Sequence, residues 1–243
     1  MIRGALYFLW LAISVIPYGA AIVLASIFVR GRPLYSLALG YLRQMTVAGR
    51  LVGGIHHRVH GAENLPPADS MEPVIICPKH QSTWETFALP TLMTHPLGYV
   101  FKKELLMIPF FGWAIGRLDM VHIDRSKRAE AWSKVAEQGK ELMGRGVWII
   151  MFPEGTRTER GKQGGYKTGA SRLAVATGAS IVPIAVTSAR CWPRKTFRMT
   201  PGVIDVSIGK PIPSEGRQPD ELMKQVEAWI EGEMRRLDPE AYE

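Results

Sequence analysis

Short runs of apolar residues alternate with segments of helical periodicity from residue 56 to the C-terminus. The apolar runs have the continuity of strands buried on both faces; they are residues 74–77, 99–101, 120–123, 147–152 and 181–186, and residues 203–208 add a strand of alternating pattern. The helical segments are residues 86–93, 126–143, 170–177 and 219–237. Strands that alternate with helices form a mostly parallel sheet flanked by helices. We therefore expect one α/β domain over residues 56–243.

The first 55 residues differ because they contain a long uncharged segment. Residues 5–29 carry no charged side chain and are flanked by Arg3 and Arg30. A helix of that length can cross the hydrocarbon core of a bilayer. Pro17 divides the segment into halves of about 12 residues, each about 18 Å long as a helix. The segment is therefore either one kinked membrane span or a hairpin that enters one leaflet.

Residues 34–52 have the spacing of an amphipathic helix. Apolar side chains recur at helical intervals, while Arg43 and Arg50 lie on another face. Such a helix either lies in the membrane interface or packs on the domain. More basic residues follow the uncharged segment than precede it, so the positive-inside rule places the bulk of the chain in the cytoplasm. We expect residues 1–55 to be membrane-anchoring helices.

The net charge narrows the choice of partner. The chain has 30 basic and 22 acidic residues, a formal charge of +8, so nucleic acid, an anionic membrane surface and a phosphorylated substrate each fit. Two cysteines are too few for a disulfide framework. His56, His57 and His60 lie close together in the sequence, but no carboxylate or cysteine nearby completes a metal site. We expect no metal to bind.

The segment from Lys79 to Glu85 carries the first candidate chemistry. It directly follows an apolar run, so His80 falls in the turn after a strand and Glu85 in the first turn of the next helix. In this arrangement Glu85 can orient His80 as a general base. Ser82 and Glu85 also have the spacing of a capping box, in which the glutamate accepts a hydrogen bond from the backbone of the cap. Catalysis and capping are both open at this point.

Further charged residues follow other apolar runs in the same way. Arg125, Glu154 and Arg157 each come shortly after a run, and so does Lys103. The carboxyl ends of parallel strands meet at one edge of a sheet, where α/β proteins bind ligands. Arginine binds phosphate through a fork of parallel hydrogen bonds. The sequence therefore predicts that a base, a carboxylate and phosphate-binding cations gather at this edge.

Four short motifs, in order, resemble those of the 1-acyl-glycerol-3-phosphate acyltransferases, a family of glycerolipid acyltransferases. The family motif Asn-His-x-x-x-x-Asp is similar to residues 79–85, and Phe-Ile-Asp-Arg is similar to residues 122–125. Phe-Pro-Glu-Gly-Thr-Arg is matched in full at residues 152–157, and a Val-Pro within a strand is matched at residues 182–183. The resemblance covers residues 59–211.

The resemblance departs at two positions, because Glu85 replaces the usual aspartate and Lys79 the usual asparagine. It implies that an acyl group passes from acyl-CoA or acyl carrier protein to the free hydroxyl of a lysophospholipid. The expected acceptor is 1-acyl-glycerol 3-phosphate, and the product is phosphatidic acid. His80 would be the general base and Glu85 the group that orients it. The reaction needs no acyl-enzyme, metal or cofactor.

The resemblance also implies a set of substrate-binding residues, namely Lys103, Arg125, Glu154, Gly155, Thr156 and Arg157. The three basic residues would hold the acceptor phosphate. Glu154 would position the glycerol hydroxyl, and Gly155 would let backbone N–H groups approach the reacting oxygen.

The expected partners are membrane lipids, the lysophospholipid and the acyl donor, with no nucleic acid. The expected location is the inner membrane of a bacterium, with the α/β domain on the cytoplasmic side. One alternative is an enzyme that acts on a different lysolipid; another is a membrane-anchored lipid-binding module without turnover. A hydrolase that uses Cys77 or Ser82 with His80 would need an oxyanion hole that the sequence does not identify.

Overall fold

The computed structural model describes residues 1–123 and 128–242. Across these residues seven strands form one sheet in the order β1-β7-β6-β2-β5-β3-β4. Neighbouring strands are parallel except β6 and β7. The strands are β1 (Ile55–His60), β2 (Val74–Pro78), β3 (Leu97–Lys102), β4 (Val121–Ile123), β5 (Trp148–Ile150), β6 (Ser180–Val186) and β7 (Gly202–Ile208). The expected α/β fold with a mostly parallel sheet is confirmed.

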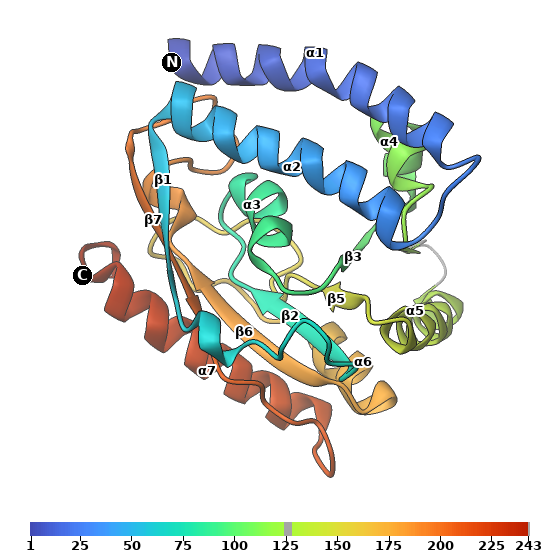
Figure 1. Ribbon diagram of the computed structural model, residues 1–243. Helices are drawn as coiled ribbons and strands as arrows, with labels where there is room; N and C mark the ends of the chain where they lie inside the picture. The colour runs from blue at the N-terminus through green and yellow to red at the C-terminus, as the bar shows by residue number, and fades with distance from the viewer. Residues whose placement is uncertain (124–127, 243) are drawn as a thin grey trace.

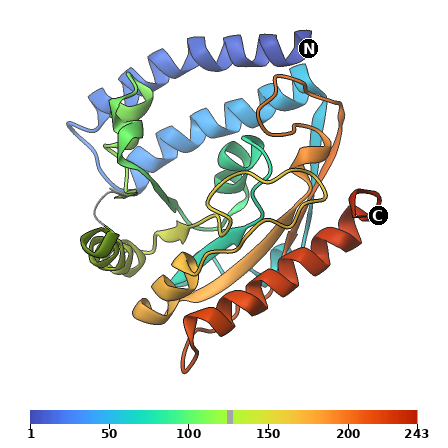
Figure 2. The same cartoon turned by 180° about the vertical axis from the view of Figure 1, so that it is seen from behind.

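Helices cover both faces of the sheet (Figures 1 and 2). They are α1 (Ile2–Ala25), α2 (Arg32–Gly53), α3 (Trp84–Leu92), α4 (Phe111–Ile115), α5 (Arg128–Gly144), α6 (Gly169–Thr177) and α7 (Pro219–Leu237). Successive side chains of a strand point to opposite faces. In β2, Val74 and Ile76 therefore join a core with α2 and α3, while Ile75 and Cys77 join a core with α5, α6 and α7.

The uncharged N-terminal segment folds as one helix, because α1 continues through Pro17. Its 24 residues extend about 36 Å at about 1.5 Å per residue. This excludes the hairpin within residues 5–29 and leaves the single helix. Tyr7 and Ile22 are buried, whereas other large apolar side chains of α1 are exposed, namely Leu6, Leu9, Trp10, Ile13 and Ile16. Among the described residues α1 is the helix long and apolar enough to cross a membrane, by length and composition.

The second N-terminal helix packs on the domain. α2 lies between α1 and the sheet (Figure 1), and its side chains Tyr41, Met45 and Ala48 belong to the same core as α3. The packing interpretation of residues 34–52 is therefore confirmed. The histidines at residues 56–60 lie on β1, where His60 hydrogen-bonds Asp205 of β7 at 2.9 Å.

The register of the central strands aligns the turns that follow them. Ile76 of β2 pairs with Ile150 of β5, and Tyr99 of β3 pairs with the same residue on its other side. Because these strands are parallel, the segments after β2, β3 and β5 leave the sheet at a common edge. The fold therefore brings together turns that are about 20 to 75 residues apart in the sequence, as a parallel sheet requires.

Candidate active site

His80 and Glu85 face each other at this edge. His80 lies in the turn after β2, and Glu85 lies in the first turn of α3. The Nδ1 atom of His80 is 2.7 Å from Oε2 of Glu85. The Glu85 side chain is fully buried, whereas 13% of the His80 side chain is exposed. The carboxylate thus holds the inner edge of the imidazole ring and leaves its outer edge accessible.

The same carboxylate caps the start of α3. Oε1 of Glu85 accepts hydrogen bonds from the backbone N–H groups of Gln81 at 3.0 Å and Ser82 at 2.9 Å, and also from the Ser188 hydroxyl. The Ser82 hydroxyl accepts a hydrogen bond from the Trp84 N–H at 3.2 Å, so the half of the capping box that runs from the Glu85 carboxylate to the Ser82 N–H is present, while the hydroxyl bonds Trp84 and not the Glu85 N–H. Capping and orientation of the histidine are therefore two results of one geometry.

A pocket of about 490 Å³ opens beside the histidine, and we call it the histidine pocket. The His80 ring stacks on Phe152, with ring centroids 3.7 Å apart. Gly155 and Lys167 line the polar part of the pocket, and apolar residues line the rest, including Val100, Trp132 and Val135. A polar group of a substrate can thus meet His80 while an apolar portion lies beside it.

Glu154 lies in the interior rather than in this pocket. Its side chain is 1% exposed, and its Oε1 accepts a hydrogen bond from the His80 N–H at 3.3 Å and pairs with Lys79 Nζ at 3.4 Å. Burial raises the pKa of Glu154 from 4.5 to about 7, although the Lys79 ammonium group lowers it. The structure therefore places Glu154 behind the backbone of His80, and not where a glycerol hydroxyl would meet it.

The other expected binding residues lie in different settings. Gly155 lines the histidine pocket with a φ of +67°, Thr156 is exposed, and Arg157 is partly buried. Lys103 is exposed at the start of a short 3₁₀ helix, Lys103–Met107, after β3. Arg125 lies outside the described residues.

Lys167 is a pocket residue that the sequence-based site did not include. An added Cβ on Gly155 would stand 2.9 Å from Lys167 Nζ, so the ammonium group lies directly against that glycine. The available signal was its place after a glycine-rich loop, at the start of α6.

A second pocket, of about 170 Å³, is almost entirely apolar, and we call it the apolar pocket. It lies between the two N-terminal helices and the segments α3, β3 and α4, and its lining includes Ile22, Ala38, Phe87, Phe111 and Ala114. The apolar segment at residues 108–113 contributes both to this pocket and to the surface. Phe111 lines the pocket, while Trp113 is 51% exposed.

Comparison with known proteins assigns the chain to a family. The family model described as "Acyltransferase" matches residues 56–187. The chain belongs to the acyltransferase family. It is 37% identical over 242 residues to a 1-acyl-sn-glycerol-3-phosphate acyltransferase of Pseudomonas aeruginosa, covering 98% of this chain and 92% of that relative. It is 31% identical to the human 1-acyl-sn-glycerol-3-phosphate acyltransferase alpha, covering 89% of this chain and 72% of the human protein.

The fold is also that of a solved acyltransferase. The crystal structure of the 1-acyl-sn-glycerophosphate (LPA) acyltransferase PlsC from Thermotoga maritima matches with a TM-score of 0.80 and 24% identity, covering 98% of this chain and 95% of that one. The resemblance seen in the motifs is therefore confirmed, and the chain is an acyltransferase of the 1-acyl-sn-glycerol-3-phosphate acyltransferase type.

Proposed function

We propose that this acyltransferase moves a fatty acyl group from acyl-CoA or acyl carrier protein to the free hydroxyl of 1-acyl-glycerol 3-phosphate and so forms phosphatidic acid. The observation that carries the proposal is the hydrogen bond from His80 Nδ1 to the buried carboxylate of Glu85 at the mouth of a pocket. The names of the Pseudomonas and human relatives supply the acceptor.

His80 acts as the general base in this reaction. An alcohol is a weak nucleophile until a positioned base takes its proton as it attacks. Glu85 keeps the proton of the neutral ring on Nδ1, so Nε2 carries the free lone pair, and the carboxylate stabilises the imidazolium that forms. The acceptor oxygen bonds to the thioester carbon, the carbon–sulfur bond breaks, and the imidazolium returns its proton to the departing thiolate. Because the substrate hydroxyl attacks directly, no acyl-enzyme forms.

Basic side chains bind the acceptor phosphate. We assign this role to Lys103, Arg125 and Arg157, and we add Lys167 because it lines the pocket. Gly155 and Thr156 belong to the same turn, where a glycine at positive φ lets the backbone approach the substrate closely. Glu154 does not line the pocket, so we assign it to the support of His80 rather than to the glycerol hydroxyl.

The apolar pocket accommodates an acyl chain, since its walls offer almost no polar surface. Both acceptor and product are membrane lipids, and the exposed apolar residues of α1 match such a location. We propose that residues 1–55 anchor the protein in the bacterial inner membrane, with residues 56–243 on its cytoplasmic side. The partners are then membrane lipids, the lysophospholipid and the acyl donor. The chemistry as written needs no metal or cofactor.

The test is acyl transfer by the purified full-length protein with labelled acyl-CoA or acyl carrier protein and lysophosphatidic acid. We expect His80→Ala to abolish phosphatidic acid formation, while His56→Ala, an exposed histidine on β1, retains it. Equal product from the wild type and His80→Ala would overturn the mechanism. Preference for another lysolipid or for glycerol 3-phosphate would change the acceptor, and release of free fatty acid without an acceptor would indicate a hydrolase.

A further inference from the structure

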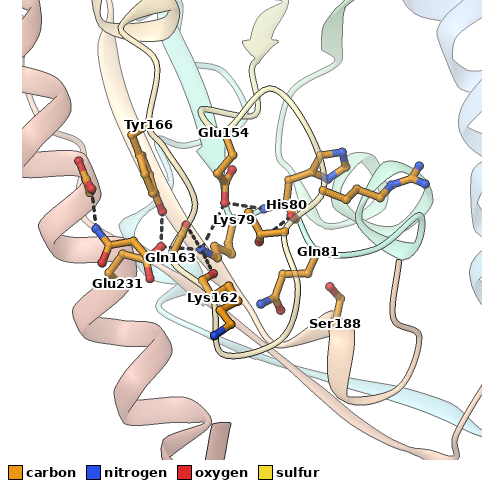
Figure 3. A network of polar contacts seen from close by, with 12 residues as sticks. Lys79, His80, Gln81, Glu154, Lys162, Gln163, Tyr166, Ser188 and Glu231 are labelled. Carbon is orange, nitrogen blue, oxygen red and sulfur yellow. Dashed lines mark hydrogen bonds and ion pairs between the residues drawn. The ribbon is translucent and has the colours of Figure 1, made fainter. Parts of the chain in front are cut away.

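Lys79, the residue before the proposed base, is fully buried beside the active site. Its ammonium group contacts Glu231 of α7 at 2.5 Å and Glu154 at 3.4 Å. It also donates hydrogen bonds to the backbone carbonyls of Lys162 at 3.2 Å and Gln163 at 2.8 Å. Figure 3 shows Lys79 between the two glutamates, with Tyr166 beside Glu231. A buried lysine is rare unless its charge is paired, and here it has two carboxylates.

The cluster holds more negative than positive charge. Lys79 is one cation between two buried glutamates, and the Tyr166 hydroxyl adds a hydrogen bond to Glu231 at 2.7 Å. One oxygen of each glutamate, Oε2, has no hydrogen-bond partner among the described residues. A buried carboxylate without a cation is costly, and Lys79 is the cation that contacts both glutamates.

This cluster contacts the backbone of His80 through Glu154. The His80 N–H donates to Oε1 of Glu154, and the His80 carbonyl accepts hydrogen bonds from both the N–H and the hydroxyl of Thr158, at 2.7 and 3.1 Å. Residues that follow β5 therefore bind both the N–H and the carbonyl of His80. Of the two residues that bind the His80 backbone here, Glu154 is the charged one, and it pairs with the Lys79 ammonium group.

We propose that Lys79 is a positioning residue for the reaction. It holds the Glu154 carboxylate against the His80 N–H, and through Glu231 it joins α7 to the turn that carries His80 after β2, which we call the histidine turn. The proposal rests on the role of His80 as the base. An asparagine, the residue usual in the resembling motif, is too short to reach α7 and carries no charge to balance two glutamates.

Removal of the ammonium group has a defined electrostatic effect. The groups that interact with Glu154 come from several elements, namely Lys79, His80, Cys77, Glu85, Tyr166 and Tyr242. Glu231 contacts the same Lys79 ammonium group. Lys79 lowers the pKa of Glu154, which burial raises to about 7. Without Lys79 that pKa rises further, so Glu154 is protonated at neutral pH. A protonated Glu154 is a weaker acceptor for the His80 N–H, so the backbone of the base is held less firmly.

The experiment is the pH dependence of kcat for phosphatidic acid formation in the wild type, Lys79→Met, Glu154→Gln and the double variant. We expect the wild type to lose activity below about pH 7, and Lys79→Met to need a pH at least one unit higher for half-maximal kcat. In the Glu154→Gln background, Lys79→Met should produce no such shift, because the titrating group is gone. Lys224→Met, an exposed lysine on α7, should behave as the wild type.

A structural role alone would lower the melting temperature of Lys79→Met and leave the pH profile unchanged, and that result overturns the proposal. An equal shift with and without Glu154 overturns it too. If Lys79→Met does not fold, Lys79→Asn and Glu231→Gln replace it. Lys79→Asn should raise the midpoint pH, and Glu231→Gln should lower it by removing a neighbouring negative charge. Activity retained by His80→Ala would instead reject the proposed base, whatever the Lys79 variants do.

Discussion

Glu85→Gln isolates the electrostatic role of the buried carboxylate. Four groups donate hydrogen bonds to its two oxygens: His80 Nδ1, the N–H groups of Gln81 and Ser82, and the Ser188 hydroxyl. Glutamine replaces one acceptor oxygen by an NH₂ donor. At the Oε1 position that NH₂ would oppose the N–H groups of Gln81 and Ser82, whereas at Oε2 it meets only the Ser82 N–H, which is also bonded to Oε1. The NH₂ therefore takes the Oε2 position and faces His80 Nδ1. The neutral ring then carries its proton on Nε2. That atom has no free lone pair and cannot act as the base.

The size of the effect follows from these contacts. Restoring the productive tautomer would set an NH₂ against an N–H in a buried site, a mismatch of about 1–3 kcal/mol. The variant also loses the charge that stabilises the imidazolium. Since general base catalysis contributes about 10²- to 10⁴-fold, we expect kcat to fall within that range, or roughly 3–5 kcal/mol. The Oε1 contacts to the backbone persist, so the melting temperature should fall by only about 2–4 °C for a loss of 1 kcal/mol.

The assay is kcat for acyl transfer measured beside thermal unfolding. Glu221→Gln is the matched control, because it is an exposed glutamate in the first turn of a helix, α7. A Glu85→Gln variant with a lowered melting temperature and kcat within tenfold of the wild type would refute the reasoning. It would mean that Glu85 caps α3 and does nothing more.

Three further outcomes are expected. Because the pKa of Glu154 is raised from 4.5 to about 7, its contribution to stability is present below pH 4.5 and is lost as the pH rises through 7. Glu154→Gln should remove this loss of roughly 3 kcal/mol in the free energy of unfolding. Chemical denaturation at pH 5 and pH 8 measures the loss, with Glu221→Gln as the control. Gly155→Ala, at φ +67° and against Lys167, should cost about 1–2 kcal/mol and raise KM for the acceptor; an unchanged KM would contradict the placement. Ala114→Phe should narrow the apolar pocket and reduce turnover more with long-chain than with short-chain substrates, so equal losses in a chain-length series would count against it.

Local patterns predicted much of the fold. Continuous apolar runs identified the buried strands because both faces of the sheet are covered, and the helix at residues 219–237 has the predicted bounds. The His80–Glu85 geometry was also accessible, since a turn and a capping box are set by residues within one short segment. The antiparallel pairing of β7 with β6 could not be predicted, because an alternating pattern carries no information on strand direction.

Long-range polar contacts were beyond the reach of those patterns. Glu154 follows a strand in a charged turn, which favours an exposed ligand-binding side chain, yet it is buried because α7 and the loop before α6 close over it. In the sequence Lys79 is only a departure from the usual asparagine of the motif, because no residue near it indicates a contact with Glu231. Pro17 left a single kinked helix and a hairpin both open, and the structure has one helix that packs on α2.

The ion pair between Lys79 and Glu231 joins residues 152 positions apart. During synthesis on the ribosome, the N-terminal helices and the whole histidine turn emerge long before the last helix is translated. Until α7 docks, Lys79 has neither its helix partner nor a closed interior to occupy. A nascent or C-terminally shortened chain therefore carries every sequence motif of the enzyme while Lys79 lacks its partner on the final helix.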